Sequence, residues 1–229
     1  MIRAMIVDDD ALVRLGLADL LASDLDITVV AQAGDGLQAQ ELAAAHTPDV
    51  VLMDVRMPRL DGISAIKKLR ALPRPPHVIT LTTFDVEVYV YDALAAGADG
   101  FLLKDTDPAE ILRAVHLVMS GSAMLHPTAA RHLIDRYHHT ARPHAQIAQA
   151  RIATLTPRET DVLSLLADGA TNAEIADGLG MRESTVKAHV SRILTSLDVG
   201  NRVQAALLVR DAGLRHAPAT PPSRQGRSS

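Results

Sequence analysis

The chain has 229 residues, of which 48% are hydrophobic and 22% charged, and it contains no cysteine. This composition supports a packed core and excludes disulfides, thiolate metal sites and a cysteine nucleophile. The net charge is −4, but residues 1–125 carry −8 and residues 126–229 carry +4. An acidic half joined to a basic half predicts two domains, with the second a candidate for nucleic-acid binding.

No segment of the sequence is typical of a membrane protein. The start MIRAMIVDDD lacks a long apolar stretch behind basic residues, so no secretory signal is expected. No apolar run approaches the roughly 18 residues that cross a bilayer. We therefore expect a cytoplasmic protein without a membrane partner.

Residues 1–121 alternate between short apolar runs and longer amphipathic patterns. The short runs are rich in Val, Ile and Leu and predict buried strands: AMIVDD, ITVVAQAG, DVVLMD, HVITLTTF and GFLLKD. Between them, apolar residues at three- and four-residue spacing predict helices: ALVRLGLADLLAS, GLQAQELAAAH, GISAIKKLRAL, EVYVYDALAAGA and PAEILRAVHLVMSG. Five strand–helix units in succession predict an α/β domain with a five-stranded, doubly wound parallel sheet.

Charged and hydroxyl side chains cluster at the ends of these strands. Asp8 and Asp9 end the first strand, Asp54 the third, Thr82 the fourth and Lys104 the fifth. Ligands of open parallel sheets bind at the carboxyl ends of the strands, so these side chains are expected to meet. Three carboxylates repel one another unless a cation lies among them, and oxygen-only ligands suit Mg²⁺. Asp54 is the natural nucleophile for a phosphoryl group, with Lys104 and Thr82 at its oxygens.

The motifs VDDD, LMDVRMPRLDG, TLTTFD and GADGFLLKD resemble the receiver domain of two-component response regulators, in matching order over residues 1–121. The resemblance implies a flavodoxin-like fold in which Asp8, Asp9 and Asp54 hold Mg²⁺ with the backbone carbonyl of Arg56. It also implies that Asp54 receives the phosphoryl group from a sensor histidine kinase, with Thr82 and Phe101 as switch residues. Phenylalanine cannot make the hydrogen bond of a tyrosine, so Phe101 would act through packing.

Residues 122–153 change character, and we interpret them as a linker that is helical in part. The stretch is polar and histidine-rich and contains two prolines. His138, His139 and His144 could suggest a metal site, but they lack a carboxylate at matching helical spacing, so a solvated linker is favoured. Residues 217–229 are rich in proline and serine and are expected to be disordered.

Residues 154–216 carry repeated helix-start signals. TPRE from Thr156 and TNAE from Thr171 are capping boxes, and Asn201 and Ser184 are further cap candidates. In the acidic half, Asp10 is expected to begin the first helix. Four short helices in about sixty residues predict a small all-α domain with a helix-turn-helix over NAEIADGLGMRESTVKAHVSRILTSL.

The second helix of this pair has two distinct faces. One face groups Val186, Val190, Ile193 and Leu197 and is expected to pack in the core. The other is small, polar and basic, which suits entry into a DNA major groove better than an ordinary solvated helix of mixed charge.

This region is similar to the LuxR-type helix-turn-helix of the NarL/FixJ subfamily over residues 154–214. The resemblance implies that Lys187, Ala188 and Ser191 face bases and that His189 and Arg192 lie near the backbone. Thr171 and Asn172 begin the first helix of the pair, where a phosphate contact is plausible. The last helix would supply the homodimer contact through Val203, Ala206 and Leu207, although some of these residues must also be core.

The sequence therefore predicts a phosphorylation-controlled, DNA-binding transcription regulator rather than an enzyme. An aspartyl phosphatase would typically carry a second acid two residues past the nucleophile, where this chain has Arg56. RNA binding is disfavoured because no aromatic residue lies in 154–216. A DNA-binding regulator with a phosphorylation-independent receiver remains the alternative.

Overall fold

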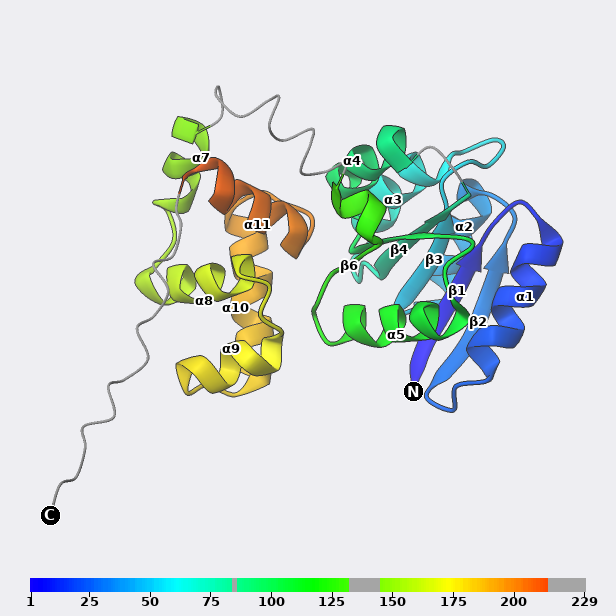
Figure 1. Ribbon diagram of the computed structural model, residues 1–229, viewed down its shortest axis with the longest axis horizontal. Helices are drawn as coiled ribbons and strands as arrows, with labels where there is room; N and C mark the ends of the chain where they lie inside the picture. The colour runs from blue at the N-terminus through cyan, green and yellow to red at the C-terminus, as the bar shows by residue number, and fades with distance from the viewer. Residues whose placement is uncertain (84–85, 132–144, 214–229) are drawn as a thin grey trace, which may run out of the picture.

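The computed structural model describes residues 1–83, 86–131 and 145–213. Within them the chain forms an α/β domain, drawn from blue to green in Figure 1, and a helical domain drawn from yellow-green to orange. No helix in these described ranges is long and apolar enough to cross a membrane. The predicted tail 217–229 lies outside the described residues, as do His138, His139 and His144.

The sheet of the α/β domain has the order β2-β1-β3-β4-β5-β6, and all neighbouring strands pair in parallel. Five long βα units alternate along the chain. The strands are β1 (Ile2–Val7), β2 (Ile27–Ala33), β3 (Val50–Asp54), β4 (His77–Thr82), β5 (Gly100–Leu103) and β6 (Met124–Leu125). The helices are α1 (Ala11–Ala22), α2 (Gly36–His46), α3 (Gly62–Arg70), α4 (Val86–Ala96) and α5 (Pro108–Met119).

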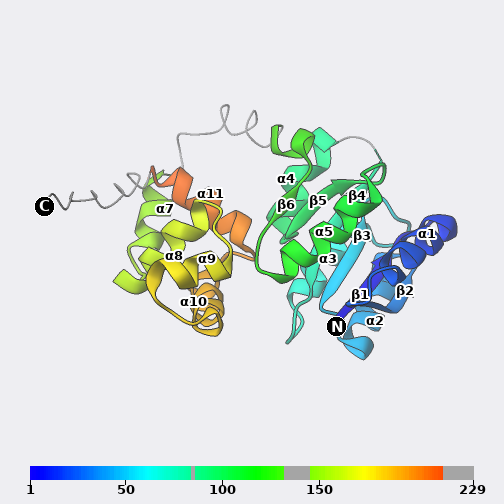
Figure 2. The same ribbon diagram turned by 60° about the horizontal axis from the view of Figure 1, so that its bottom comes forward.

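Two apolar layers hold the helices on opposite faces of the sheet (Figure 2). Leu17 and Leu21 of α1 share one buried cluster with Ile111 and Val115 of α5. The inner residues of α2, α3 and α4 share the other cluster, which contains the fully buried Phe101. This arrangement confirms the doubly wound fold that the alternating pattern predicts.

The sequence-based boundaries need one correction at β6. The prediction of five strands misses Met124–Leu125, which pairs in parallel with Gly100 and Phe101. The expected linker therefore begins too early, because its first residues extend the sheet. A two-residue edge strand has no periodicity of its own, and its pairing with β5 alone defines it.

The helical domain consists of α7 (Ala145–Ile152), α8 (Pro157–Ala167), α9 (Asn172–Leu179), α10 (Glu183–Ser196) and α11 (Arg202–Asp211). The last four are the predicted helices. The first, α7, lies inside the expected linker, yet its Ala148 and Ile152 belong to the buried cluster of this domain. The expected linker is thus too long at this end as well.

Side-chain caps fix most of the helix starts. Thr156 and Thr171 each form the predicted capping box, and Asn201 accepts from the backbone N–H of Gln204. Asp10 accepts from Leu12 N and begins α1, as expected. The Ser184 cap is wrong, because α10 starts at Glu183 after Arg182, which makes no side-chain cap.

Candidate phosphoacceptor site and DNA-binding surface

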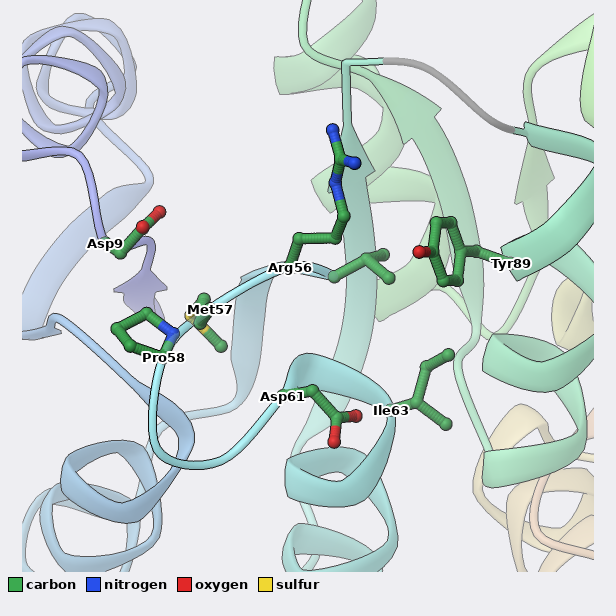
Figure 3. Close-up of a pocket in the computed structure, with 8 residues that line it drawn as sticks. Asp9, Arg56, Met57, Pro58, Asp61, Ile63 and Tyr89 are labelled. Carbon is green, nitrogen blue, oxygen red and sulfur yellow. The ribbon is translucent and has the colours of Figure 1, made fainter.

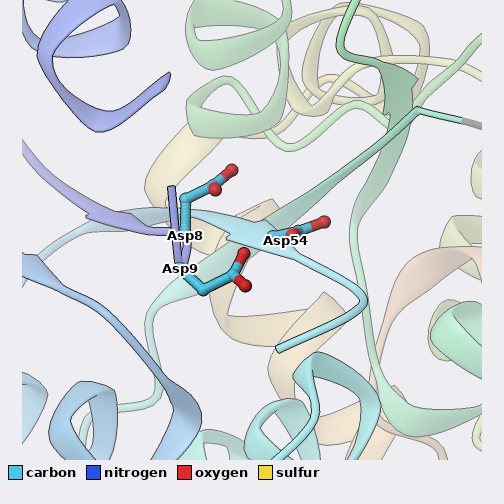
Figure 4. A group of neighbouring side chains, drawn as sticks. All are labelled: Asp8, Asp9 and Asp54. Atoms are coloured by element: carbon cyan, nitrogen blue, oxygen red, sulfur yellow. The ribbon is translucent and has the colours of Figure 1, made fainter. Parts of the chain in front are cut away.

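Three carboxylates meet at the carboxyl edge of the sheet (Figure 4). Asp8 and Asp9 follow β1 and Asp54 ends β3, so the topology delivers all three to the same place. One carboxylate oxygen from each lies within 4.8 Å of the others. Asp8 and Asp54 are buried and Asp9 is exposed, so the cluster opens to solvent on the Asp9 side.

Lys104 supplies the positive charge of this cluster. Its Nζ lies 2.6 Å from Oδ2 of Asp8 and 3.1 Å from Oδ2 of Asp54. The end of β5 places it there, with the backbone N–H of Lys104 bonded to the Thr82 carbonyl at 2.8 Å. Burial alone would lower the pKa of Lys104, but its ion pairs with Asp8 and Asp54 outweigh burial and raise it.

The carboxyl of Asp54 is held in an environment that disfavours its charge. Burial, assisted by the negative charge of Asp8, raises the pKa of Asp54 in spite of the opposing effect of Lys104. The backbone N–H of Val55 donates to Oδ1 of Asp54 at 2.7 Å, which leaves Oδ2 facing Lys104. One lysine does not fully compensate three acids, so a further cation would complete the charge balance.

The donor set fits a divalent cation such as Mg²⁺. All the side-chain ligands are carboxylate oxygens, and one face of the cluster is open to waters, which this ion retains. Asp8, Asp9 and Asp54 would hold it. Arg56 stands two residues after Asp54 in the chain segment that borders the site, and its carbonyl remains the predicted fourth protein ligand.

A pocket of about 510 Å³ opens beside the carboxylates (Figure 3). Its lining comes from the turn after β1, the loop after β3, the first turn of α3 and the first turn of α4. Its lining combines two acids and one arginine with apolar side chains: Asp9, Val55, Arg56, Met57, Pro58, Asp61, Ile63 and Tyr89.

Two backbone features hold the acids in place, and the contact of Arg14 is one that the sequence analysis did not predict. Nη1 of Arg14 donates to the carbonyls of Asp8 and Asp9 at 2.7 and 3.2 Å. A side chain at Gly62 would overlap the Asp54 carbonyl, so only glycine lets α3 start so close to β3. The sequence shows Arg14 in the first turn of α1, but its target depends on the fold of the turn.

The two predicted switch residues lie in different surroundings. Thr82 ends β4 with only 2% of its surface exposed, one strand away from both Asp54 and Lys104. Phe101 is fully buried and shares its apolar cluster with Val90, Ala93 and Leu94 of α4. Phe101 therefore contacts α4 through apolar packing.

The helix α10 presents the predicted polar face to solvent. Val186, Ile193 and Leu197 are fully buried and Val190 is half-buried, which confirms the core face. Ser184, Lys187, Ala188, Ser191 and Arg192 are exposed and His189 is half-buried. The described receiver residues leave this face uncovered.

Two side-chain pairs order that polar face. Nζ of Lys187 lies 3.0 Å from Oε1 of Glu183, one turn earlier. Arg192 Nη2 lies 3.2 Å from Nδ1 of His189. Glu183 is an acid on a surface that would meet phosphates, so its pairing with Lys187 competes with any DNA contact by that lysine.

The first turn of α9 and the start of α11 pack against the receiver domain. Asn172 is 5% exposed and lies against Gly121, which follows α5. Val203 and Leu207 pack with the receiver's apolar cluster, whereas Ala206 packs in the helical core. Three residues predicted to contact DNA or a second copy thus lie at an interface inside one chain: Asn172, Val203 and Leu207.

Two amide side chains of α11's first turn bond to the end of α4. Nδ2 of Asn201 donates to the Ala98 carbonyl at 2.6 Å, while its Oδ1 caps α11. Nε2 of Gln204 donates to the carbonyls of Leu94 and Ala95 at 2.7 and 2.8 Å. These carbonyls lie at and after the C-terminal end of α4, where intrahelical donors run out, so the contact satisfies the helix end.

The comparisons with known proteins agree with both domains. Residues 4–116 match the response regulator receiver domain, and residues 153–209 match the luxR family of bacterial regulatory proteins. The transcriptional regulatory protein LiaR of Bacillus subtilis is 39% identical over 210 residues, which cover 90% of this chain and 96% of LiaR. The nitrate/nitrite response regulator NarL of Escherichia coli is 36% identical over 205 residues, covering 90% and 93%.

A solved structure supports the same assignment. The response regulator ChrA of a heme-sensing two-component system aligns with a TM-score of 0.51 at 36% identity, covering 91% of this chain and 96% of that chain. The relatives are transcriptional regulators, which does not favour the phosphatase alternative. The chain therefore belongs to the two-component response regulators that carry a LuxR-type DNA-binding domain, and it is a transcription regulator.

Proposed function

We propose that Asp54 accepts a phosphoryl group from a sensor histidine kinase and that this modification controls DNA binding. The observation that carries the proposal is the position of Lys104 Nζ, 2.6 and 3.1 Å from carboxylates that meet at the edge of the sheet. Phosphoryl transfer depends mainly on positioning and on neutralising charge, and this cluster provides both.

The transfer is an in-line displacement at phosphorus. Oδ2 of Asp54 forms the new P–O bond while the P–N bond of the kinase phosphohistidine breaks, and the leaving imidazole keeps the electron pair and takes a proton. Lys104 offers its ammonium to the phosphoryl oxygens, and the Thr82 hydroxyl is predicted to bond one of them. Mg²⁺ held by Asp8, Asp9 and Asp54 would supply further neutralisation of the phosphoryl charge.

Phosphorylation would act on the domain interface through α4. It adds about −1.5 to −2 charges beside Lys104 and draws Lys104 and Thr82 toward the new oxygens. Phe101 packs in one cluster with the inner side of α4, and the same cluster includes Val203 of α11. A shift of this packing would weaken the contact of Asn201 and Gln204 with α4, freeing α11 for a homodimer on double-stranded DNA.

DNA binding at fixed salt tests the proposal. Wild type and Asp54→Asn are compared with and without a small phosphodonor and Mg²⁺, on a duplex selected for binding. We expect the donor to raise the affinity of wild type by about 5- to 150-fold and to leave Asp54→Asn unchanged. Gain of one phosphoryl mass by wild type alone verifies the site.

A second candidate function is a DNA-binding regulator whose receiver works without phosphorylation. The exposure of the polar face of α10 in the present arrangement favours it, because base contacts would need no release. The same measurements separate the two. Equal affinity of wild type and Asp54→Asn in all conditions supports this candidate and contradicts phosphorylation control.

A further inference from the structure

The loop between β3 and α3 supplies most of the pocket lining beside the carboxylates, yet little of the loop is buried. It consists of residues 55–61 and includes Arg56, whose carbonyl is the predicted fourth ligand of the divalent ion. Four of these seven residues are exposed, and among the seven only Val55 is buried. A loop with so few buried contacts depends on hydrogen bonds and ion pairs to keep its shape.

A buried carboxylate outside the acidic site pairs with this loop. Asp35 is fully buried at the start of α2, where its Oδ1 accepts from the backbone N–H groups of Leu37 and Gln38 at 2.8 and 3.0 Å. Its Oδ2 is paired with the guanidinium of Arg59, and no other donor reaches that oxygen in the described part of the chain. A buried charge is costly unless it is paired, so this oxygen ties the loop to α2.

The backbone of the loop supports the same contact. Arg59 has a φ of +65°, a left-handed conformation that glycine adopts freely and that strains a residue with a side chain. The next carbonyl, of Leu60, accepts from the N–H of Gly36 at 3.1 Å. A Cβ at Gly36 would lie 2.7 Å from that carbonyl oxygen, so glycine allows α2 to start this close to the loop. An arginine in a strained conformation indicates that its side chain has a use.

We propose that the Asp35–Arg59 pair positions the loop after β3, and that the loop in turn presents the Arg56 carbonyl to the divalent ion. Neither side chain of the pair belongs to the carboxylate cluster, so both are positioning residues. The other attachment of the loop is independent, because the N–H of Gly62 bonds to the Val55 carbonyl at 3.0 Å. Arg56 lies between the two attachments, and loss of the pair would free the segment that carries its carbonyl.

The inference rests on the proposed Mg²⁺ binding and adds what sets its affinity. Arg59→Gly removes a positive charge near a site for a dication, so electrostatics alone would leave the Mg²⁺ affinity unchanged or raise it. The substitution also removes the left-handed strain. Positioning predicts the opposite sign, because the loop would no longer hold the carbonyl in place. Groups that orient the ligands of a metal site commonly change metal affinity by about 10-fold or more.

A double-mutant cycle with Asp35→Asn makes the test quantitative. Asparagine caps a helix as well as aspartate does, so α2 keeps its start while the buried charge is lost. If the pair acts as a unit, Arg59→Gly, Asp35→Asn and the double variant should each raise the Mg²⁺ dissociation constant by about 10-fold. Electrostatics alone would shift the two single variants in opposite directions and leave the double variant close to wild type.

Amide NMR titrations of the full chain with MgCl₂, without a phosphodonor, measure these dissociation constants. Thr47→Gly is the control for strain, because Thr47 is exposed at the far end of α2 and has a φ of +43°. Lys67→Met, at an exposed position of α3, is the control for charge. Both controls should bind Mg²⁺ as wild type does. The amide of Gly36 should exchange with solvent faster in Arg59→Gly than in wild type or either control.

Two outcomes overturn the inference. In one, Arg59→Gly binds Mg²⁺ as tightly as wild type or more tightly. In the other, the losses add to about 100-fold in the double variant. If Arg59→Gly does not fold, the double variant leaves no buried charge unpaired and decides alone, with wild-type affinity overturning the inference and a loss of about 10-fold supporting it. Failure of wild type to bind Mg²⁺ would instead overturn the proposed ion site, so the two failures are distinguishable.

Discussion

Two groups of buried polar side chains in this molecule are completed in opposite ways. At the carboxyl edge of the sheet, Asp8 and Asp54 both reach one lysine, and the excess negative charge leaves room for a cation. At the domain interface and in the chain segment after Gly121, atoms of Asn172, Arg202 and Ser122 are buried without a partner in the described residues. The carboxylate group has room to bind a cation, whereas the second group would be exposed to water if the two domains separated.

The difference follows from how each group is supported. Strand ends and hydrogen bonds to the backbone fix the carboxylates, so their repulsion persists until a counter-charge arrives. The interface is held by the amides of Asn201 and Gln204 on helix-end carbonyls and by the apolar contact of Val203, so separating the domains exposes polar groups that water can bond as well as an apolar surface. An acidic site fixed at strand ends, joined to an interface of amide hydrogen bonds and an apolar contact, is a suitable combination for a switch.

Lys104→Met gives the largest expected effect, because it leaves two buried acids without their shared cation. We expect a loss of about 3 kcal/mol in the free energy of unfolding without divalent ions. Urea unfolding in a chelating buffer measures it, and Mg²⁺ should restore part of the loss. Lys67→Met, at an exposed position of α3, is the control. A loss no larger than that of the control would mean that the acids are not held charged.

Addition of Mg²⁺ to wild type is expected to have the next largest effect. At 100 times the dissociation constant, a ligand that binds only the folded state stabilises it by about 2.7 kcal/mol. In thermal unfolding over a Mg²⁺ series, the stabilisation of wild type should reach this value. Asp9→Asn should need a far higher Mg²⁺ concentration for the same stabilisation. Asp10→Asn keeps the cap of α1 and should behave as wild type, since Asp10 only begins that helix. Equal shifts in the two variants would exclude Asp9 as a ligand.

The sequence predicts the carboxylate site better than the interface, for a physical reason. Asp8, Asp54 and Lys104 each follow an apolar run, and parallel topology brings strand ends together whatever the details of packing. Local signals likewise predict the capping boxes at Thr156 and Thr171, because cap and partner lie three residues apart.

No local sequence signal predicts which surface the residues of the domain interface contact. Val203 and Leu207 are apolar on an outer helix, which indicates that something covers them but not what. The receiver of the same chain does so here, and the dimer contact remains a prediction. The packing of α7 into the helical domain lacked a local signal for a similar reason, since Gln149 Nε2 bonds to the carbonyl of Ala212, 63 residues away, at 2.8 Å.

The pH dependence of stability should have opposite signs at Asp54 and Asp99. Burial raises the pKa of Asp54, so its contribution is present below its unfolded value and is lost as the pH rises through the folded value. Burial also acts on Asp99, but His77, Arg70 and Val78 N–H outweigh it and lower the pKa. Its contribution is therefore present above its unfolded value and is lost as the pH falls through the folded value.

Urea unfolding from acid to neutral pH tests these signs in magnesium-free buffer. Asp99→Asn should cost about 1–3 kcal/mol at neutral pH, and the cost should shrink in acid. Asp54→Asn should be neutral or stabilising at neutral pH and lose that advantage in acid. Parallel pH curves of both variants and wild type would contradict the assigned environments.

Ser122→Ala should have the smallest effect on the free energy of unfolding, and that effect should be zero or stabilising. Its Oγ is buried without a hydrogen-bond partner among the described residues, so its removal relieves a desolvation cost and breaks no bond. We expect the free energy of unfolding to be unchanged or to rise by up to about 1 kcal/mol. Thr156→Ala, which removes a satisfied cap, should lower it by about 1 kcal/mol. If Ser122→Ala destabilises the chain as much as Thr156→Ala does, the hydroxyl has a partner in solution. The interface would then be satisfied like the rest of the fold, and the contrast with the carboxylate site would be lost.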